Sequence, residues 1–498
     1  MATTKSKVKN NSYGIHWFRR DLRIAGNESL RFNWTKNDGR VLGIFVFDKK
    51  FLARSDFSIN RFQFFLETLS ALKDELQKAG GDLLVLDVSA PVAFEKLFSY
   101  LQKSDIDLPS LVSWSRDYEP YARARDEQMQ FFLKKSNVPV HTERDHLLIE
   151  PHELSRDDGS SYQVYSPFSR KWLELFKTPV IQERIRRQTQ GIKYLVDLQK
   201  GSPQKMFHLR WSEILGTNHE FKDCLDIFIS NNLKNVSVPI PKAGSQSAFE
   251  KLQKFKKSIE NYKDGRDFPN RTATSGLSIF LKNGSLTTSQ IVAHLGLEPY
   301  HKKKSSQDTF FSELIWREFY YHILFHHPRV ENEAFLVKYK KIKWQNNEKW
   351  FSAWKNGLTG FPIVDAGMRQ LKSTGWMHNR VRMIVASFLT KDLLIDWQWG
   401  EQHFMEALLD GDLAANNGGW QWAASTGCDP QPYFRIFNPW LQSAKFDPDG
   451  EYIKEFVPEL KGTPAKDLHE PIIGHKIYPA PIVDHSVQRN LALKMYEV

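Results

Sequence analysis

The stretch RFQFFLETLSALKDELQKAGGDLLVLDV, residues 61–88, decides the fold of the first part of the chain. Its apolar residues recur at spacings of three and four until a Gly-Gly pair ends the pattern: Phe62, Phe65, Leu66, Leu69, Leu72 and Leu76. That spacing predicts an amphipathic helix, and the apolar run DLLVLDV after it predicts a buried strand. A helix that leads directly into a buried strand is the repeating unit of an α/β sheet.

Three further apolar runs predict buried strands: YGIHWF at residues 13–18, VLGIFVFD at 41–48 and SLVSWS at 110–115. Strands that alternate with helices predict a Rossmann-like parallel sheet, covered by helices on both faces, over residues 1–150. No GxGxxG follows the first strand, so the usual dinucleotide-binding fingerprint is missing. Any ligand of this α/β domain must therefore be held in another way.

The rest of the chain divides into a connector and a helical domain. Over residues 151–244 the periodicity weakens and SRDDGSS, KGSPQ and VSVPIPKAGS are loop signals, which predicts an inter-domain connector with some helix. Residues 245–498 predict an all-α domain, with helical patterns at residues 310–326, 367–371 and 379–397. Basic clusters fall in this half at HKKK (301–304) and KYKKIKW (338–344). Such clusters are commonly solvated faces, but beside tryptophans they also suit nucleic acid.

Composition narrows the class of protein. The chain has 498 residues and a formal charge of +11, which allows two or three domains and makes polyanions a plausible partner class. Cys224 and Cys428 are far apart without CxxC spacing, so neither a disulfide framework nor a zinc module is indicated. The sequence lacks a signal-peptide core and any run of membrane-spanning length. We therefore expect a soluble cytoplasmic protein without a metal.

The segment ELIWREFYYH places an acid, a large ring and a cation on one helical face. Glu313, Trp316 and Arg317 stand at positions i, i+3 and i+4. In one interpretation the three groups face a ligand together. In the alternative, Glu313 and Arg317 form a surface pair while Trp316 packs.

A second polar constellation lies downstream, in WMHNRVRM and DGDLAANNGGWQWAAS. Asn379, Arg382 and Met383 share one helical face, and an amide beside Met on a largely apolar helix suggests a ligand cavity. Asp410 and Asp412 can both turn inward if their backbone is irregular, and the adjacent Gly-Gly pair suits a closely approached loop.

Other chemistries are poorly supported by the same residues. Paired carboxylates suggest a glycosidase or a cation site, but no EF-hand spacing or second acidic motif accompanies them. His322, His326 and His327 lack an HExxH arrangement, and no GxSxG nucleophile motif occurs. Inward amides, carboxylates, an arginine and tryptophans suit a planar polar cofactor better than hydrolysis.

Several segments are distinctive as whole motifs. They are WFRRDLRIAGNESL, RDFPNRTATSGLS, ELIWREFYYHILFHHP, and the run from TGFPIVDAGMRQLKSTGWMHNRVRM through DGDLAANNGGWQWAASTG to PYFRIFNP. Together they closely resemble the photolyase/cryptochrome family over nearly the whole chain, and within it the class I cyclobutane pyrimidine dimer (CPD) photolyases. The resemblance implies an α/β antenna domain, a connector and a helical domain that holds U-shaped FAD.

The resemblance also implies how FAD is held. Asn416 is similar to the amide that faces flavin N5, Arg382 and Asp410 to the ion pair beside the ring, and Asp412 to a carboxylate at the ring or ribityl edge. The loop that cradles the phosphates corresponds to Tyr262, Thr274, Ser275, Leu277 and Ser278. Hydroxyls and backbone N–H groups suit such an anion. Gly276 stands where some relatives carry Arg, so one phosphate contact is expected to be missing.

The tryptophans take two roles in this resemblance. Trp420, Trp397 and Trp344 resemble the chain that carries an electron from the surface to the photoexcited flavin. Trp316 and Trp422 resemble the apolar wedge for a flipped-out dimer, an extrusion that costs less for a poorly stacked lesion. For the substrate, the resemblance implies that Glu313 hydrogen-bonds a dimer carbonyl and that Asn379 holds the pyrimidine edge.

DNA contacts and the reaction follow from the same likeness. Four arginines match positions that touch phosphates around the lesion or share the lesion-facing helix: Arg266, Arg317, Arg380 and Arg435. The implied reaction is light-driven, with an electron passing from reduced FAD to the dimer and returning, so that there is no net redox change. We expect a monomer that associates with the nucleoid through DNA.

Three alternatives to CPD repair are considered. Six-four photolyases carry histidines where this chain has Asn379 and Met383, and signalling cryptochromes usually add a C-terminal tail that is not seen here. A redox-inert FAD protein that only binds DNA would require loss of Glu313 or Asn416, and both are present. CPD repair is the favoured function.

The antenna chromophore is left open. In folate-binding relatives a Glu occupies the position that is Ala122 here, after Tyr121, and the second folate site differs at Glu331 and Asn332. Methenyltetrahydrofolate is therefore not favoured. An 8-hydroxydeazaflavin, a second flavin and an empty site all fit the sequence.

Overall fold

A parallel five-stranded sheet forms the first part of the molecule. The computed structural model describes residues 12–199, 205–216, 220–300 and 305–497, so the HKKK cluster lies outside the described residues. The strands are β1 (Gly14–Trp17), β2 (Val41–Val46), β3 (Leu83–Leu86), β4 (Leu111–Ser115) and β5 (Val140–Glu143). Their order is β3-β2-β1-β4-β5, with every pair parallel. This is the strand order of a Rossmann sheet, which confirms the predicted α/β fold.

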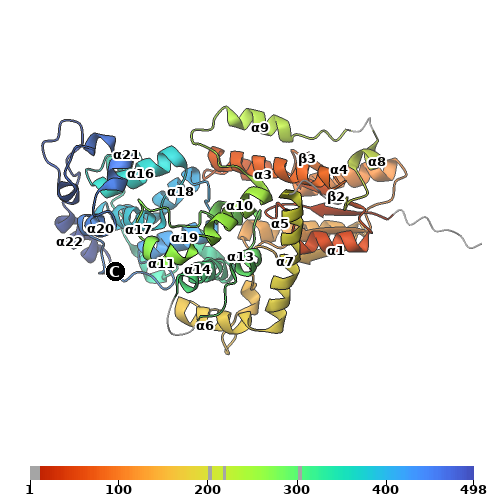
Figure 1. Ribbon diagram of the computed structural model, residues 1–498, viewed down its shortest axis with the longest axis horizontal. Helices are drawn as coiled ribbons and strands as arrows, with labels where there is room; N and C mark the ends of the chain where they lie inside the picture. Colours follow the sequence, from red (N-terminus) through yellow and green to blue (C-terminus); the bar gives the residue numbers. More distant parts are fainter. Residues whose placement is uncertain (1–11, 200–204, 217–219, 301–304, 498) are drawn as a thin grey trace, which may run out of the picture.

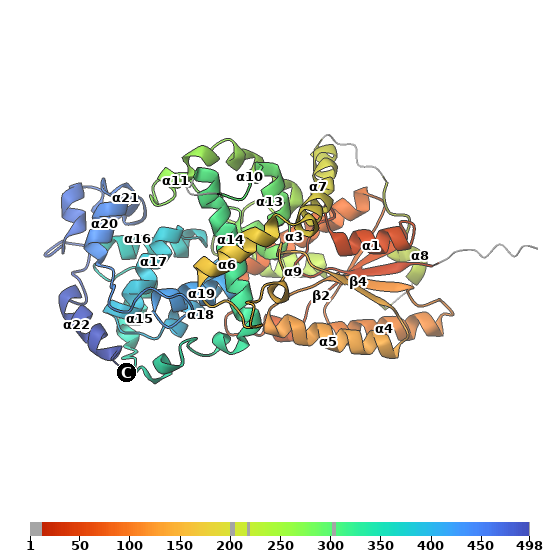
Figure 2. The same cartoon turned by 90° about the horizontal axis from the view of Figure 1, so that it is seen from below.

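Helices cover both faces of this sheet, as Figure 2 shows. On one face lie α1 (Glu28–Lys36) and α3 (Ile59–Lys78), and on the other α4 (Ala90–Lys103) and α5 (Pro120–Lys135). Helix α3 begins where the Ser58 hydroxyl accepts a hydrogen bond from the Arg61 N–H, and the chain turns at Gly80, whose φ is +90°. The apolar stripe expected from the sequence therefore lies against β2 and β3.

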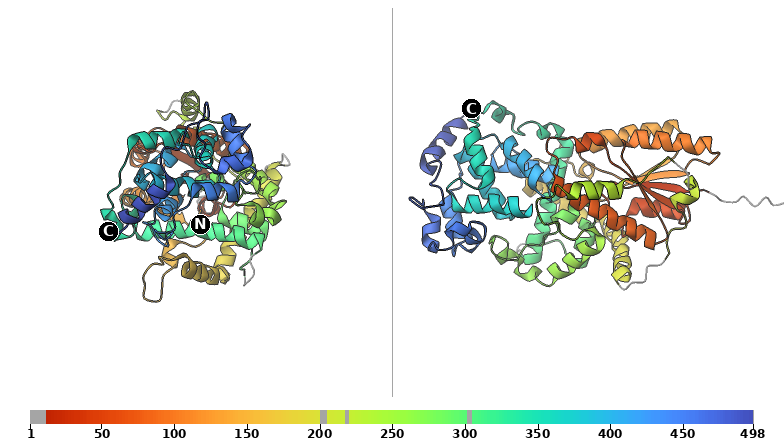
Figure 3. Two further views of the ribbon diagram at one scale, coloured as in Figure 1. Left: turned by 90° about the vertical axis from the view of Figure 1, so that its left-hand side faces the viewer. Right: turned by 90° about the horizontal axis from the view of Figure 1, so that it is seen from above.

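The second part of the molecule is helical and lies end to end with the sheet domain (Figures 1 and 3). Its α-helices are α10 (Gly244–Lys256), α11 (Tyr262–Gly265), α12 (Ser278–Asn283), α13 (Thr288–Leu295), α14 (Ser306–His326), α15 (Glu348–Asn356), α16 (Pro362–Thr374), α17 (Asn379–Ser387), α18 (Trp397–Ala407), α19 (Leu413–Ala423), α20 (Pro439–Phe446), α21 (Glu451–Phe456) and α22 (His485–Met495). Helix α14 packs against α11 and α19. The predicted all-α domain is confirmed.

The predicted single helical run over residues 379–397 is wrong. Helix α17 passes into a π-helical turn, Phe388–Asp392, and the helical path then stops at Leu394, which has a φ of +53°. Helix α18 starts afresh at Trp397, where the Asp396 carboxylate accepts a hydrogen bond from the Gln398 N–H. A left-handed residue cannot be recognised in an apolar run, because Leu rarely adopts that conformation.

The connector packs on both parts of the molecule and is richer in helix than predicted. Its α-helices are α6 (Tyr165–Phe176), α7 (Pro179–Gln199), α8 (Trp211–Leu215) and α9 (Leu225–Leu233). Helices α6 and α7 contact α14 and α13 of the helical part. The Trp211 N–H donates to the carbonyl of Gly43 in β2 at 2.7 Å, and α9 packs along α3 (Figure 1). The connector therefore joins the two parts by packing as well as by chain.

No helix among the described residues is long and apolar enough to cross a membrane. Within the same part of the chain, no group of His, Cys, Asp and Glu side chains could hold a metal ion.

Candidate functional site

The predicted ion pair of the flavin site forms in the helical domain. Arg382 Nη2 lies 3.0 Å from each carboxylate oxygen of Asp410, and Arg382 Nε donates to the Met377 carbonyl at 2.8 Å. The Ser278 hydroxyl donates to Asp410 Oδ2 at 2.7 Å. Helices α12 and α17 are thereby held to the segment that precedes α19.

The proposed phosphate loop lies between α11 and α12. Tyr262 is buried against Phe255 and Phe310, while Thr274 and Ser275 are half-buried. Gly276 has a φ of +61°, a conformation that glycine adopts without strain, and a Cβ there would meet only the flexible end of the Lys251 side chain. Leu277 is buried, and its N–H lies 3.4 Å from the Ser275 hydroxyl oxygen. The loop presents hydroxyls and backbone beside the Arg382–Asp410 pair.

Asp412 turns toward the α/β domain. Its Oδ2 accepts from the Tyr321 hydroxyl at 2.6 Å and from Arg20 Nη2 at 2.9 Å, and Lys282 Nζ lies 3.8 Å away. Burial would raise the pKa of Asp412, but the Lys282 and Arg20 charges outweigh burial and hold the pKa well below its ordinary value. Oδ1 is buried without a partner among the described residues.

The two neighbouring amides of α19 differ in their surroundings. Asn416 is half-buried and donates to the Glu401 carbonyl at 3.0 Å. Asn417 is buried and donates to the Val330 carbonyl and to Glu401 Oε1, at 2.9 and 3.0 Å. Burial raises the pKa of Glu401 to about 8, so its side chain is largely protonated at neutral pH. Asn416 therefore lies on the less buried side of α19. Its amide and that of Asn417 are both bonded to Glu401, a contact that the sequence did not predict.

The candidate lesion residues come from α14 and α17, which are linked by the segment after α11. Arg266 pairs with Glu313, and Asp267 accepts from Arg380 Nη2 at 2.8 Å. The segment after α11 therefore bridges α14 and α17 through its adjacent, oppositely charged residues Arg266 and Asp267. Arg380 also lies over the ring of Phe446, 4.3 Å from its centroid. Glu313 pairs with Arg266 rather than with Arg317, so the surface pair considered from the sequence does not form.

The aromatic wedge is built from stacked rings. Trp316 stacks on Tyr165 of α6 with ring centroids 3.6 Å apart and an interplanar angle of 5°. Trp422 and Met383 are half-buried, and Asn379 is exposed at the first residue of α17. Tyr165 was not predicted, because nothing in the local pattern of the connector shows that it reaches α14.

The tryptophans proposed for electron transfer share one hydrophobic cluster. Trp420 and Trp397 are buried in it, and the half-buried Trp344 packs against its edge. Trp420 also contacts Trp354, with ring centroids 6.0 Å apart, a neighbour that the sequence did not single out. A Cβ at Gly400 would lie 2.1 Å from Trp420 Cη2, so the indole packs directly on the α18 backbone.

The structure places Arg317, for which a DNA contact is expected, at the interface between the two parts of the molecule. Its Nη1 donates to the His146 carbonyl of the α/β part at 2.8 Å, and its guanidinium lies over the Tyr321 ring. Arg317 therefore contacts the α/β part across the domain interface. Arg435, in contrast, is exposed, and Arg266 and Arg380 are half-buried at the lesion side.

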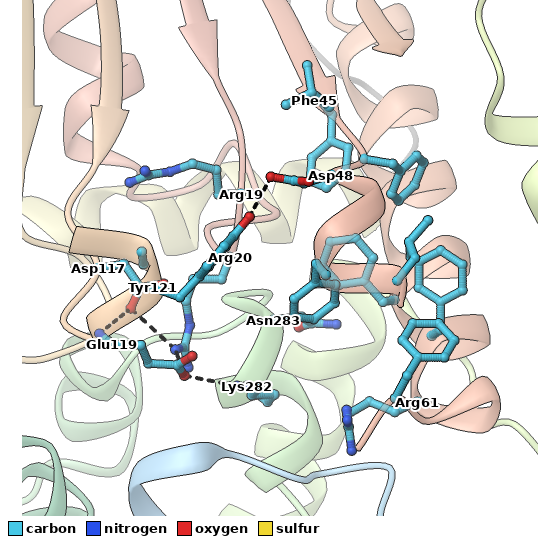
Figure 4. A pocket seen from close by; sticks show the side chains of 18 of the residues that line it. Arg19, Arg20, Phe45, Asp48, Arg61, Asp117, Glu119, Tyr121, Lys282 and Asn283 are labelled. Carbon is cyan, nitrogen blue, oxygen red and sulfur yellow. Dashed lines mark hydrogen bonds and ion pairs between the residues drawn. The ribbon is translucent and has the colours of Figure 1, made fainter. Parts of the chain in front are cut away.

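The α/β part contains a cavity of about 190 Å³ at the carboxyl ends of its strands (Figure 4). Its wall is mainly apolar and includes Trp17, Phe47, Phe51, Phe62, Tyr121 and Ala122. Four arginines and one lysine, with carboxylates between them, also line it: Arg19, Arg20, Arg61, Arg125 and Lys282. No sequence fingerprint marks this cavity, although Tyr121 and Ala122 were considered as antenna positions.

Comparison with known families follows the same division of the chain. The family model of the DNA photolyase domain matches residues 14–185, and that of the FAD binding domain of DNA photolyase matches residues 310–498. The chain belongs to the DNA photolyase family. It is 37% identical to the deoxyribodipyrimidine photo-lyase of Alkalihalophilus pseudofirmus and 36% identical to that of Escherichia coli. The alignments cover 97% of this chain, and 97% and 98% of those proteins.

Solved structures of photolyases have the same fold. A class III photolyase from Agrobacterium tumefaciens superposes with a TM-score of 0.80 at 32% identity, covering 99% of both chains. An archaeal photolyase from Sulfolobus tokodaii, solved with two FAD molecules, gives a TM-score of 0.79 at 30% identity over 97% of this chain and 99% of that one. The family and the fold are confirmed, whereas membership of class I stays a prediction.

Proposed function

We propose that this photolyase repairs cyclobutane pyrimidine dimers in DNA by light-driven electron transfer. The supporting observation is the near-full-length similarity to deoxyribodipyrimidine photo-lyases, together with the Arg382–Asp410 pair, whose helix α17 contacts helix α19, which carries Asn416. FAD is the cofactor that the helical domain holds.

The residues present fit FAD. The hydroxyl-bearing loop that ends at Ser278 suits phosphates, and its side chains meet the Arg382–Asp410 pair. The buried Asp412 Oδ1 has no donor among the described residues, and a buried carboxylate oxygen normally has one. A donor of the flavin ring or of the ribityl chain would satisfy it. When bound and reduced, FAD supplies the photoexcited electron that splits the dimer and receives that electron back.

This chain's own residues bind and orient the lesion. Glu313 is half-buried and paired with Arg266, and the pair would face a carbonyl of the dimer, where the N–H groups of Arg266 can stabilise the developing negative charge. Trp316, fixed by Tyr165, and Trp422 supply apolar surface for a base that has left the stack. Asn379 at the start of α17 supplies an amide for the pyrimidine edge.

The surroundings of Asn379 favour the cyclobutane dimer over the six-four photoproduct. The nearest histidine in sequence, His378, is buried and accepts a hydrogen bond at Nδ1 from the Arg380 N–H. Burial lowers the pKa of His378 to about 4, so its imidazole is neutral at physiological pH. A neutral histidine that caps a helix is poorly suited to give a proton to a six-four lesion.

The test is photorepair of a defined oligonucleotide. Purified protein with fully reduced FAD is mixed with DNA that carries one thymine dimer, and the recovery of thymine absorbance under near-UV or blue light is compared with a dark control. A second oligonucleotide carries one six-four photoproduct. Recovery confined to the dimer supports the proposal; recovery confined to the six-four lesion, or none, overturns it in favour of a six-four photolyase or a cryptochrome.

Two variants test the roles proposed for Glu313 and Asn379. Glu313→Gln and Asn379→Ala are expected to lower the yield of repair more than they lower DNA affinity, and equal losses of both would count against their roles. Glu260→Gln is the matched control, because the Glu260 side chain is exposed and its hydrogen bond is to Gln307, away from the lesion residues.

We also propose that the cavity of the α/β part holds a second, planar chromophore. Aromatic walls with arginines at the rim suit a flat ring that carries an anionic chain. Folate is not favoured, whereas an 8-hydroxydeazaflavin or a flavin is. Reconstitution with each compound should add one absorbing chromophore per FAD, and Ala122→Phe, which fills the cavity, should abolish that addition while FAD stays bound. Uptake unchanged by Ala122→Phe would refute this location.

DNA binding, assembly and location complete the proposal. Phosphate contacts come from Arg266, Arg380 and Arg435, with exposed lysines of residues 338–343 adding to the field. We expect a monomer, located in the cytoplasm and associated with the nucleoid through DNA. Light scattering of the free protein and of its DNA complex tests the monomer.

A further inference from the structure

Arg20, in the loop after β1, is divided between the two parts of the molecule. On the α/β side its Nη1 donates to Glu119 Oε1 at 2.8 Å and lies 3.5 Å from Asp117. On the helical side its Nη2 donates to the Tyr321 hydroxyl at 2.7 Å and to Asp412 Oδ2 at 2.9 Å. The side chain is only 12% exposed. Figure 4 shows Arg20 beside Glu119 and Lys282, at the end of the cavity that faces the helical domain.

Of the two cations that lie beside Asp412, Arg20 and Lys282, only Arg20 is within hydrogen-bond distance. Lys282 Nζ is 3.8 Å from Asp412 Oδ2, whereas Arg20 Nη2 is 2.9 Å away and within hydrogen-bond distance. A buried carboxylate that loses its hydrogen-bonded cation incurs a large desolvation penalty or takes up a proton. Lys282 and Arg20 together keep Asp412 charged, and Arg20, through its hydrogen bond, fixes the direction of the carboxylate.

Fixing Asp412 also fixes the start of α19. Asp412 is the N-cap residue of that helix, yet its side chain makes no capping hydrogen bond, because it is engaged by Arg20 and Tyr321. Its carbonyl instead accepts the N–H of Asn416, at 2.8 Å. The residue held by Arg20 is thus hydrogen-bonded to the amide residue of the proposed flavin site.

We propose that Arg20 is a positioning residue of the flavin site, contributed by the α/β domain, which holds the Asp412 carboxylate with Oδ1 directed to the cofactor. This inference rests on the proposed function, because it assumes that Asp412 contacts FAD. The α/β domain then acts on the flavin through Asp412, beyond any light-harvesting role.

The test compares FAD release from the holoenzymes of Arg20→Gln, Asp412→Asn and the double variant, followed by flavin fluorescence. Arg20→Gln and Asp412→Asn are each expected to speed release by roughly ten- to a hundredfold, the scale of losing hydrogen bonds to a charged group. The double variant is expected to release FAD no faster than Asp412→Asn alone, because Arg20 acts through Asp412. Arg54→Gln, which removes a half-buried arginine of the same domain whose guanidinium bonds Asp56, should match the wild type.

The flavin midpoint potential separates positioning from general loss of structure. In Arg20→Gln, Lys282 still lies beside Asp412 and keeps it charged, but that charge is less compensated, so the potential should fall, whereas Asp412→Asn should raise it. Arg20→Lys keeps the charge but not the forked donor, so it should fold readily and release FAD a few times faster.

Each outcome has one meaning. Wild-type release by both Arg20 variants, additive effects in the double variant, or potential shifts of the same sign would overturn the role of Arg20. Normal release by Asp412→Asn would overturn the assumed contact of Asp412 with FAD. Absence of dimer repair by the wild type would instead refute the proposed function, so the failures remain distinguishable.

Discussion

The adjacent glycines of α19 provide a sharp test of the packing behind the lesion site. A Cβ at Gly418 would lie 2.1 Å from Cδ1 and 2.4 Å from Cε1 of Tyr320, whereas a Cβ at Gly419 would meet nothing within 4 Å. Gly418→Ala and Gly419→Ala therefore make the same chemical change one residue apart on the same helix. Only the first change collides with a packed ring.

The magnitudes follow from two opposing terms. Alanine is favoured over glycine by about 1 kcal/mol inside a helix, and both variants gain this term. Carbon atoms prefer to lie about 3.5–4.0 Å apart, so the Tyr320 ring must retreat by more than an ångström in Gly418→Ala. Overpacking of this kind costs about 1–3 kcal/mol. The free energy of unfolding of Gly419→Ala should therefore exceed that of the wild type by about 1 kcal/mol. That of Gly418→Ala should lie below that of Gly419→Ala by about 1–3 kcal/mol.

Denaturant unfolding of both variants and the wild type, each with the same FAD content, measures these differences. Tyr320 packs beside Trp316, with ring centroids 5.7 Å apart, so Gly418→Ala should also weaken binding of dimer-containing DNA relative to undamaged DNA. Equal stability of the two variants, or a more stable Gly418→Ala, would show that the α14–α19 contact is not as tight as described.

Three further predictions concern pH, electron transfer and DNA. Burial raises the pKa of Glu75 to about 7, so folding favours its protonated form and loses that stabilisation as pH rises from about 4.5 through 7. Glu75→Gln, which can still accept from Ser245, should raise the free energy of unfolding at pH 8 by about 1–3 kcal/mol and leave it unchanged at pH 4, as pH-dependent unfolding will show. Trp344→Phe should stop photoreduction of oxidised FAD but spare repair by chemically reduced protein, which transient absorption can separate. Arg435→Ala should weaken DNA binding regardless of lesion and reduce the slope of log affinity against log salt by about 1 in binding titrations.

Local patterns predicted the parts of the structure that depend on local contacts. The stripe of α3 and the strand runs define the sheet, because residues at spacings of three, four or two share a face wherever the backbone is regular. The same geometry placed Glu313 and Trp316 on one side of α14. The pairing of Arg382 with Asp410 came from the family resemblance, and no spacing argument could have predicted it.

Contacts between distant segments could not be predicted from the sequence. Tyr165 stacks on Trp316 although the two are far apart in the chain, and Arg20 bonds Asp412 across 392 positions. Neither contact leaves a periodic signal, since each arises only when separate elements dock. Arg317 shows the same limit: its spacing from Glu313 suggested a shared face, but its guanidinium is drawn to a carbonyl of the other domain.

Helix α14 connects the proposed lesion site to the interface between the two domains. One side carries Glu313, Trp316 and Tyr320, while the other carries Glu318 and Tyr321. Glu318 accepts from the N–H groups of Leu148 and Ile149 and from Trp172 Nε1, and burial raises its pKa. A buried carboxyl with three donors is costly to displace, so it fixes α14 along and around its axis. The rotation that would release Glu318 or Tyr321 would also turn Glu313 away from the proposed lesion site, and the α/β domain therefore contributes to the geometry of that site through its hydrogen bonds to α14.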